Sequence, residues 1–151
     1  MGRGPRCHTP EPRPRAVIVA DTSAWVEFLR GTGHPVARAV RELITNDADL
    51  AVTEVILMEL LAGVRPGPPR RQLRSTLLSF PLLTLQGLAD FEEAAVIYRS
   101  CNGAGDTLRS LSDCLIAVPA IRARAEILHR DRDFDAIARH TSLKVHRSSQ
   151  P

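Results

Sequence analysis

The sequence predicts an α/β domain in which helices flank a mostly parallel central sheet. Two observations favour this class: short apolar runs typical of buried strands alternate with longer segments of helical periodicity, and the chain of 151 residues has the length of one domain. Strands that alternate with helices are joined by right-handed crossovers and should therefore run parallel. Hydrophobic residues make up 44% of the chain, which is enough for a core without disulfides.

The first half of the chain should supply two strands and three helices. In order, we expect a strand at 16–20, helices at 24–30 and 35–45, a strand at 50–52 and a helix at 54–62. The first strand is a continuous apolar run, as in central parallel strands. Asp21, Thr22 and Ser23 offer N-caps for the first helix, and Gly31 ends it. Thr53 caps the third helix.

The second half continues the alternation. In order, we expect a proline-rich break at 65–70, a helix at 71–79, a strand at 82–85, a helix at 88–102, a loop at 103–107, a helix at 111–122, a strand at 126–129, a helix at 134–139 and a strand at 143–145. In the helix at 88–102, the apolar positions at helical spacing are Phe91, Ala94, Ala95 and Tyr98. Pro119 should kink the next helix, because it removes the N–H that would bond to the carbonyl of Leu115. Such a kink could shift Asp113.

The net charge of +3 is concentrated at the N-terminus. Residues 1–15 contain four arginines, one glutamate and four prolines, whereas the rest of the chain has sixteen basic and sixteen acidic residues. We expect 1–15 to be a disordered basic tail, 16–147 to form the domain and 148–151 to be a flexible C-terminus. Because the body is neutral, an anionic substrate must be held by local arginines and by metal.

Several classes of protein are disfavoured. The apolar stretches are too short to span a bilayer and the N-terminus lacks the apolar region of a secretory signal, so we expect no membrane association and a cytoplasmic protein. Three cysteines without CxxC spacing indicate neither a disulfide framework nor a zinc site. The absence of a Walker loop or GxGxxG motif gives no support to ATP or dinucleotide binding.

Four carboxylates stand beside apolar core sequence: Asp21, Glu59, Asp113 and Asp131. Burying a carboxylate is unfavourable unless its charge is compensated. Asp21 and Asp131 follow predicted strands and Asp113 lies near a helix start, so these three should share the rim where ligands bind in parallel sheets. Together the four acids favour a divalent-cation site and phosphodiester chemistry.

Each acid taken alone has a simpler interpretation. Asp21 and Asp113 could be helix-start residues, Glu59 could lie on a solvated face, and Asp131 with Asp133 could belong to a solvated turn. The joint occurrence of the four, with a hydroxyl pair after the first, favours a site. A phosphatase-like hydrolase with Asp21 as covalent nucleophile is disfavoured, because Ser23 stands where a second acid would be expected.

Four segments carry a family resemblance: DTSAWVEFLR, MELLAG, SLSDCLIA and HRDRDFDAIA. They resemble the signature segments of PIN-domain ribonucleases, particularly VapC toxins of toxin–antitoxin pairs, over about residues 17–144. The resemblance implies a PIN-like fold and a Mg²⁺- or Mn²⁺-dependent endoribonuclease that cleaves structured RNA, tRNA or rRNA. It also implies neutralisation by a cognate VapB-type antitoxin lying along the active-site groove.

The resemblance also assigns roles to residues of this chain. It implies that the metal-binding catalytic acids are Asp21, Glu59, Asp113 and Asp131, with Asp133 as an additional ligand. It further implies that Thr22 or Ser23 holds water or phosphate. In this mechanism one or two cations activate a water and offset the charge on the scissile phosphate.

Arginines near the acids are candidate phosphate contacts. Arg109 lies beside the Asp113 helix and Arg130 beside Asp131, although solvated surface arginines are the simpler interpretation. An alternative function is a catalytically weak PIN domain that serves as a protein- or RNA-binding module. Pro119 favours this alternative, because a kink at this proline could shift Asp113.

Self-association is also expected. Apolar residues on the helices, which exceed what a small neutral monomer should expose, include Trp25, Phe28, Val55, Met58 and Leu61. We expect them to form a groove for an apolar antitoxin segment, with an antitoxin arginine at the metal site. A homodimer and a toxin–antitoxin hetero-oligomer should follow.

Overall fold

The computed structural model of the chain describes residues 15–149 and contains one five-stranded sheet. Its strands are β1 (Ile18–Ala20), β2 (Leu50–Thr53), β3 (Leu82–Leu83), β4 (Glu126–Leu128) and β5 (Lys144–Val145). They lie in the order β3-β2-β1-β4-β5, and every neighbouring pair is parallel. The predicted α/β class is confirmed, and the sheet is parallel throughout.

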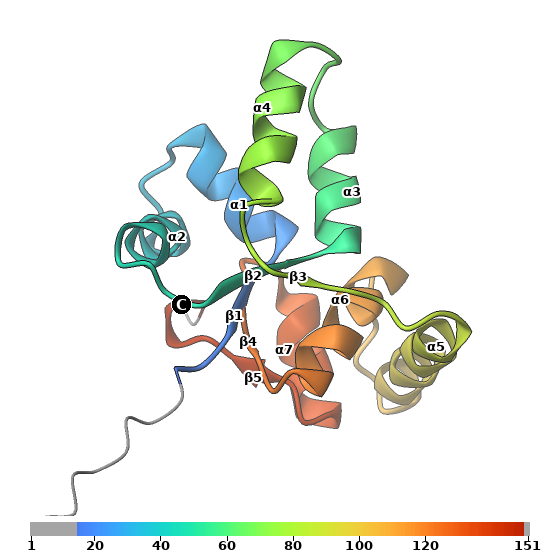
Figure 1. Cartoon of the computed structure of the whole chain (residues 1–151). Helices are drawn as coiled ribbons and strands as arrows, with labels where there is room; N and C mark the ends of the chain where they lie inside the picture. Colours follow the sequence, from blue (N-terminus) through green and yellow to red (C-terminus); the bar gives the residue numbers. More distant parts are fainter. Residues whose placement is uncertain (1–14, 150–151) are drawn as a thin grey trace, which may run out of the picture.

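Seven α-helices and a short 3₁₀-helix surround this sheet within the described residues. They are α1 (Thr22–Arg30), α2 (Pro35–Thr45), α3 (Glu54–Ala62), α4 (Pro68–Leu77), α5 (Leu88–Gly103), α6 (Leu111–Arg122), α7 (Arg132–His140) and η1 (Arg147–Ser149). In Figure 1, α1 and α2 lie on one side of the sheet and α5, α6 and α7 on the other, while α3 and α4 project together as a pair.

The core includes residues that the sequence suggested would be exposed. Trp25 is 1% exposed, and its ring lies 5.9 Å from the rings of Phe28 and Phe80, measured between centroids. Val55 is also buried, whereas Met58 is 60% exposed. The expected apolar surface is therefore smaller than predicted, because Trp25 and Val55 point into the domain from the start of their helices.

Three helices begin earlier than predicted. α1 starts at Thr22 and α7 at Arg132, because Asp21 and Asp131 are themselves the N-caps of these helices. α4 starts at Pro68, inside the segment expected to be a break. Proline is compatible with the first turn, because the N–H that it lacks would have no partner there.

Pro119 does not interrupt α6, which runs without a break from Leu111 to Arg122. Asp113 lies in the first turn of this helix, six residues before the proline. Asp113 lies in the N-terminal turn of α6, and the effect of Pro119 on its position stays a prediction.

The buried face of α5 is rotated from the one predicted. It consists of Asp90, Ala94, Ile97 and Cys101. Phe91 and Ala95 face outward, and Phe91 is 52% exposed. The rotation follows from Asp90, whose carboxylate pairs with Arg122 of α6 and accepts the N–H of Gln86 at 2.7 Å.

The C-terminal helix η1 packs against β4. Ser149 Oγ accepts the N–H of His129 at 2.8 Å, so the flexible segment expected at 148–151 begins inside this helix. The expected tail at 1–15 lies outside the described residues except for Arg15. No helix within residues 15–149 is long and apolar enough to cross a membrane.

Candidate active site

The strand order reverses direction at the centre of the sheet. From β1 the chain passes outward to β2 and β3, then returns to the other side of β1 to form β4 and β5. Such a reversal leaves a crevice at the carboxyl ends of the two central strands, where α/β proteins bind ligands. Asp21 follows β1 directly, its N–H donates to the Leu128 carbonyl at 2.9 Å, and Asp131 follows β4.

Asp21 is both a helix cap and a member of this crevice. Its Oδ2 accepts two hydrogen bonds from Ser23, from the N–H at 2.9 Å and from the hydroxyl at 2.6 Å. Its Oδ1 is buried and has no hydrogen-bond partner among the residues that the structure describes. The cap interpretation and the site interpretation are therefore compatible, because they use different oxygens.

Three further acids meet in front of it. One carboxylate oxygen from each of Asp113, Asp131 and Asp133 lies within 4.8 Å of the others. Asp113 and Asp133 are buried, at 6% and 2% exposure, while Asp131 is half-buried. Asp113 stands in the first turn of α6, and the other two open α7. Helix N-termini favour negative charge, which helps this crowding.

The charges of these acids act on one another. Burial raises the pKa of Asp113 from 3.8 to about 8, with further contributions from the negative charges of Asp21, Asp131, Asp133 and Glu59. Burial also raises the pKa of Asp21 to about 6, against the hydrogen bonds from Ser23. The other three sequence-predicted acids, and Asp133, therefore lie within electrostatic range of Asp113.

Glu59 reaches the crevice from α3 and is held by hydroxyl groups. Thr22 donates to its Oε2, and Ser112 donates to its Oε1 at 2.7 Å. The Ser110 hydroxyl lies 2.7 Å from that of Ser112 and extends the chain of hydrogen bonds. Glu59 is half-buried and faces the other acids, so the solvated-face interpretation is wrong.

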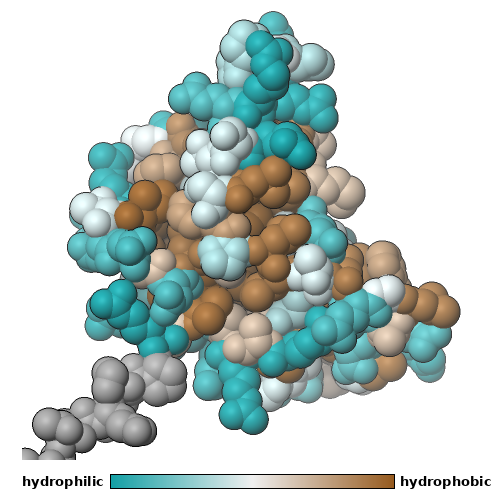
Figure 2. Space-filling model, viewed as in Figure 1, coloured by the Kyte–Doolittle hydropathy of each residue, from teal (hydrophilic) through white to brown (hydrophobic). Residues whose placement is uncertain are grey.

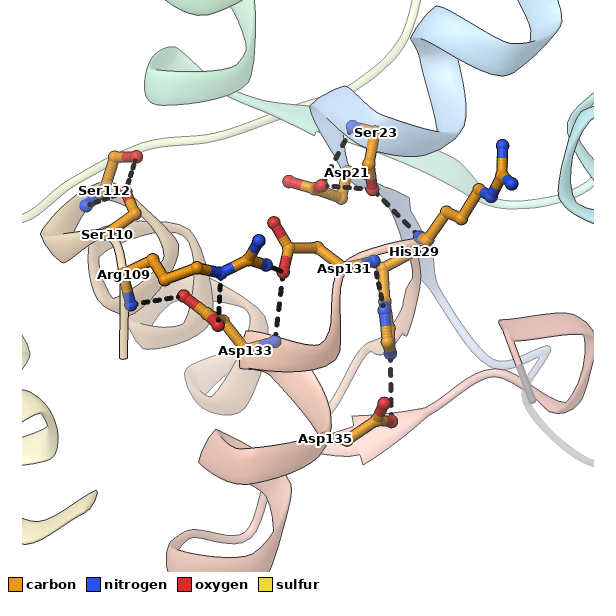
Figure 3. A network of polar contacts seen from close by, with 10 residues as sticks. Asp21, Ser23, Arg109, Ser110, Ser112, His129, Asp131, Asp133 and Asp135 are labelled. Carbon is orange, nitrogen blue, oxygen red and sulfur yellow. Dashed lines mark hydrogen bonds and ion pairs between the residues drawn. The ribbon is translucent and has the colours of Figure 1, made fainter. Parts of the chain in front are cut away.

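Arg109 contacts acids of the cluster (Figure 3). Its backbone N–H donates to Asp133 Oδ2 at 2.7 Å, its Nε donates to Asp133 Oδ1 at 3.2 Å, and its Nη2 pairs with Asp131 Oδ1. The guanidinium is thus paired with two acids of the cluster, although its side chain is 56% exposed.

Arg130 and the hydroxyl pair also have protein partners. The Arg130 guanidinium pairs with Glu27 of α1, and its N–H donates to Ser23 Oγ at 2.9 Å. Ser23 therefore links the Asp21 carboxylate to the segment after β4 (Figure 3). Thr22 and Ser23 both donate to carboxylates, which positions the acids relative to one another.

His129 belongs to the site although sequence reasoning gave it no role. It is 1% exposed, and its Nδ1 accepts the N–H of Asp131 at 3.0 Å. Its Nε2 lies 3.3 Å from Asp135 Oδ1, and its ring packs 5.3 Å from that of Phe134. Burial lowers the pKa of His129, so the neutral ring with the proton on Nε2 matches these partners. In the sequence, His129 follows the apolar strand β4 and stands two residues before Asp131, and this position could have identified it as part of the site.

The donor set fits a divalent cation. Every candidate ligand is a carboxylate oxygen, the ligand type that Mg²⁺ and Mn²⁺ prefer. Two buried oxygens, Asp21 Oδ1 and Asp113 Oδ2, have no hydrogen-bond partner within residues 15–149, and a cation would compensate them by coordination. The acidic cluster could therefore hold a metal ion.

Comparisons with known proteins agree with this geometry. The PIN domain family matches residues 18–140. The chain is 46% identical over 130 residues to VapC ribonuclease Mb1587 of Mycobacterium bovis and to ribonuclease VapC11 of Mycobacterium tuberculosis, covering 85% of this chain and 97% of each relative. The chain belongs to the VapC ribonucleases of the PIN-domain family. It is therefore a nuclease, and the family resemblance seen in the sequence is confirmed.

Solved structures share the fold of this VapC ribonuclease. FitAB bound to a DNA fragment has a TM-score of 0.67 at 19% identity, covering 89% of this chain and 97% of the other. VapBC2 of Rickettsia felis, bound to a fragment of its promoter, has a TM-score of 0.65 at 17% identity, with 86% and 97% covered. At these identities the likeness establishes the PIN fold alone.

Proposed function

We propose that this chain is the toxin of a VapBC-type pair, a Mg²⁺- or Mn²⁺-dependent endoribonuclease that cleaves structured RNA such as tRNA or rRNA. One observation carries the metal-dependent chemistry: two buried, unpartnered carboxylate oxygens, on Asp21 and Asp113, stand beside Asp131 and Asp133. A nuclease needs positive charge at this place, because its substrate is a phosphodiester anion.

Some of these residues would bind the cation, and others hold the ligands in position. Asp21, Asp113 and Asp131 are the ligands we propose, with Asp133 and Glu59 adding negative charge and fixing neighbours. A divalent cation held by these acids would supply an activated water and would offset the charge of the scissile phosphate.

The hydroxyl and guanidinium groups keep the acids in place before substrate arrives. Thr22 and Ser112 fix both oxygens of Glu59, and Ser23 fixes Asp21. Because these bonds preorganise the ligands, little reorganisation is needed when RNA binds. Arg130, on the rim, is exposed enough to exchange Glu27 for an RNA phosphate.

Cleavage of RNA by the purified chain tests this proposal. We expect cleavage of tRNA or rRNA with Mg²⁺ or Mn²⁺, none with EDTA, and products without a 2′,3′-cyclic phosphate, since water and not the 2′-hydroxyl attacks. Asp21→Asn and Asp113→Asn should abolish cleavage with the fold retained, and Glu59→Gln should lower it at least tenfold. Asp49→Asn, an exposed loop acid, is the matched control. Near-wild-type cleavage by Asp21→Asn or Asp113→Asn would overturn the site.

A groove beside the acids supports an antitoxin partner. It has a volume of about 220 Å³, and its lining includes the apolar residues Val26, Leu29 and Val64 together with Thr22 and Glu59. An amphipathic segment could lay apolar side chains along it and direct a basic residue toward the acids. Solved VapBC complexes of the same fold are consistent with such a partner.

Co-expression with the product of the adjoining reading frame tests the partner. We expect a stable complex and loss of RNA cleavage within it. Leu29→Glu, in the groove, should weaken the complex at least tenfold while leaving cleavage by the free chain intact. Leu78→Glu, which replaces an exposed leucine outside the groove, should not weaken the complex. Equal weakening by both variants would exclude the groove.

A further inference from the structure

The acidic site has two halves, which differ in whether their carboxylate oxygens contact Arg109. On one side, Asp21 Oδ1 and Asp113 Oδ2 are buried and have no hydrogen-bond partner in the described part of the chain. On the other side, Asp131 Oδ1 and both oxygens of Asp133 already face the positively charged side chain or the N–H of Arg109. Between these two halves, the positive charge that the described residues supply lies on the second.

Arg109 is fixed in the second half by more than one contact. Its backbone N–H and its Nε bind the two oxygens of Asp133, at 2.7 and 3.2 Å, and its Nη2 bridges to Asp131. A guanidinium that bridges two carboxylates in this way is always charged and has a fixed geometry, whereas a lysine ammonium is a point charge on a flexible side chain.

The carboxylates that Arg109 bridges belong to the cluster that could hold a metal. Asp131 and Asp133 supply two of its three members, and Asp113 supplies the third. In nucleases with two cations, the pair lies about 3.5–4 Å apart and shares carboxylate ligands between them. A guanidinium on two of the three acids therefore lies where the second cation would find its ligands.

We propose that Arg109 replaces a second divalent cation, so that this chain binds one divalent cation on the Asp21–Asp113 side. The guanidinium supplies the other positive charge by pairing with Asp133 and with Oδ1 of Asp131, while Oδ2 of Asp131 is left for the cation. This inference rests on the metal site of the proposed function and goes beyond it by fixing the number of cations and the role of Arg109.

Mn²⁺ titration of the full-length chain, followed by calorimetry and by electron paramagnetic resonance, tests it. We expect one Mn²⁺ per chain in the wild type. Arg109→Gln removes the charge but keeps the backbone N–H to Asp133, so it should bind two Mn²⁺ per chain, with a spin-coupled resonance signal. Arg109→Lys should remain at one.

Arg139→Gln is the matched control. Arg139 is 58% exposed, against 56% for Arg109, and it pairs with Asp106 outside the cluster, so its removal should leave one Mn²⁺ per chain. Thermal melting in EDTA verifies that each variant is folded. Two Mn²⁺ in the wild type, or one in a folded Arg109→Gln, would overturn the inference while leaving the metal site intact. Wild-type chain that binds no Mn²⁺ would overturn the proposed function as well.

Discussion

Asp113 is a buried acid whose negative charge is poorly compensated in this fold. Its carboxylate is buried, one oxygen has no partner, and four other acids add their negative charge to its surroundings. The folded chain therefore tolerates the ionised form poorly, which raises the pKa of Asp113 to about 8. Such residues are retained for function at the expense of stability.

The pKa shift predicts how stability depends on pH without metal. Between about pH 4 and pH 8 the folded chain keeps the proton of Asp113 while the unfolded chain loses it, so stability should fall over this range and level off above it. Asp113→Asn should raise stability by roughly 2 kcal/mol at pH 8 and by less at pH 5. Thermal melts in EDTA at both pH values measure this. The control Asp49→Asn should change neither, and an Asp113→Asn chain less stable than wild type at pH 8 would contradict it.

His129 should stabilise the site through the hydrogen bond that its Nδ1 accepts from the N–H of Asp131. His129→Leu keeps an apolar side chain beside Phe134 but leaves the Asp131 N–H without its acceptor, which should cost roughly 1–2 kcal/mol and weaken Mn²⁺ binding. His129→Asn offers an oxygen near the position of Nδ1 and should restore part of the Mn²⁺ affinity. Urea unfolding and Mn²⁺ titration measure the two effects. Equal Mn²⁺ affinity in His129→Leu and wild type would exclude a positioning role.

At the scale of elements, the site is built from helix beginnings. Asp21 and Asp131 cap α1 and α7, and Asp113 lies in the first turn of α6. The free N–H groups and the dipoles of these N-termini offset part of the repulsion among the acids. A change far along a helix should therefore affect stability without moving its acid.

Pro119→Ala tests this independence in α6. Alanine restores a helical N–H and removes a steric conflict, which together should stabilise the fold by about 3 kcal/mol. The loss of two buried methylene groups and the greater entropy of the unfolded chain should destabilise it by about 2–2.5 kcal/mol. We expect a small gain, of about 0.5–1 kcal/mol in urea unfolding, with unchanged Mn²⁺ affinity. A changed Mn²⁺ affinity would mean that Pro119 does influence Asp113.

At the scale of the whole molecule, α5 exposes more large apolar side chains than any other described helix. Leu88, Phe91 and Val96 of α5 are 73%, 52% and 57% exposed, and apolar residues reach the edge of the surface over α5 in Figure 2. Exposed apolar surface of this kind favours association between proteins. The homodimer expected from the sequence is better explained by α5 than by Trp25 or Val55, which are buried.

Light scattering of the purified chain tests the dimer. We expect a dimer at micromolar concentration for the wild type and a monomer for Phe91→Glu, because a carboxylate cannot be buried there without a partner. Arg99→Glu, which also places an acid on the exposed part of α5, is the control for charge alone. A monomeric wild type would contradict the prediction.

The sequence alone predicted the alternation of strands and helices, most helix ends and the candidate acids of the site, because these follow local patterns. A strand followed by Asp, a hydroxyl that caps a helix, or an acid within an apolar run involves residues a few positions apart. Tertiary structure alone decided that Trp25 is buried, that Asp90 sets the buried face of α5, and that Arg109 pairs with acids. The Arg109–Asp133 contact joins residues 24 positions apart, one in the loop before α6 and the other in α7, and only the packing of α6 against α7 brings them together.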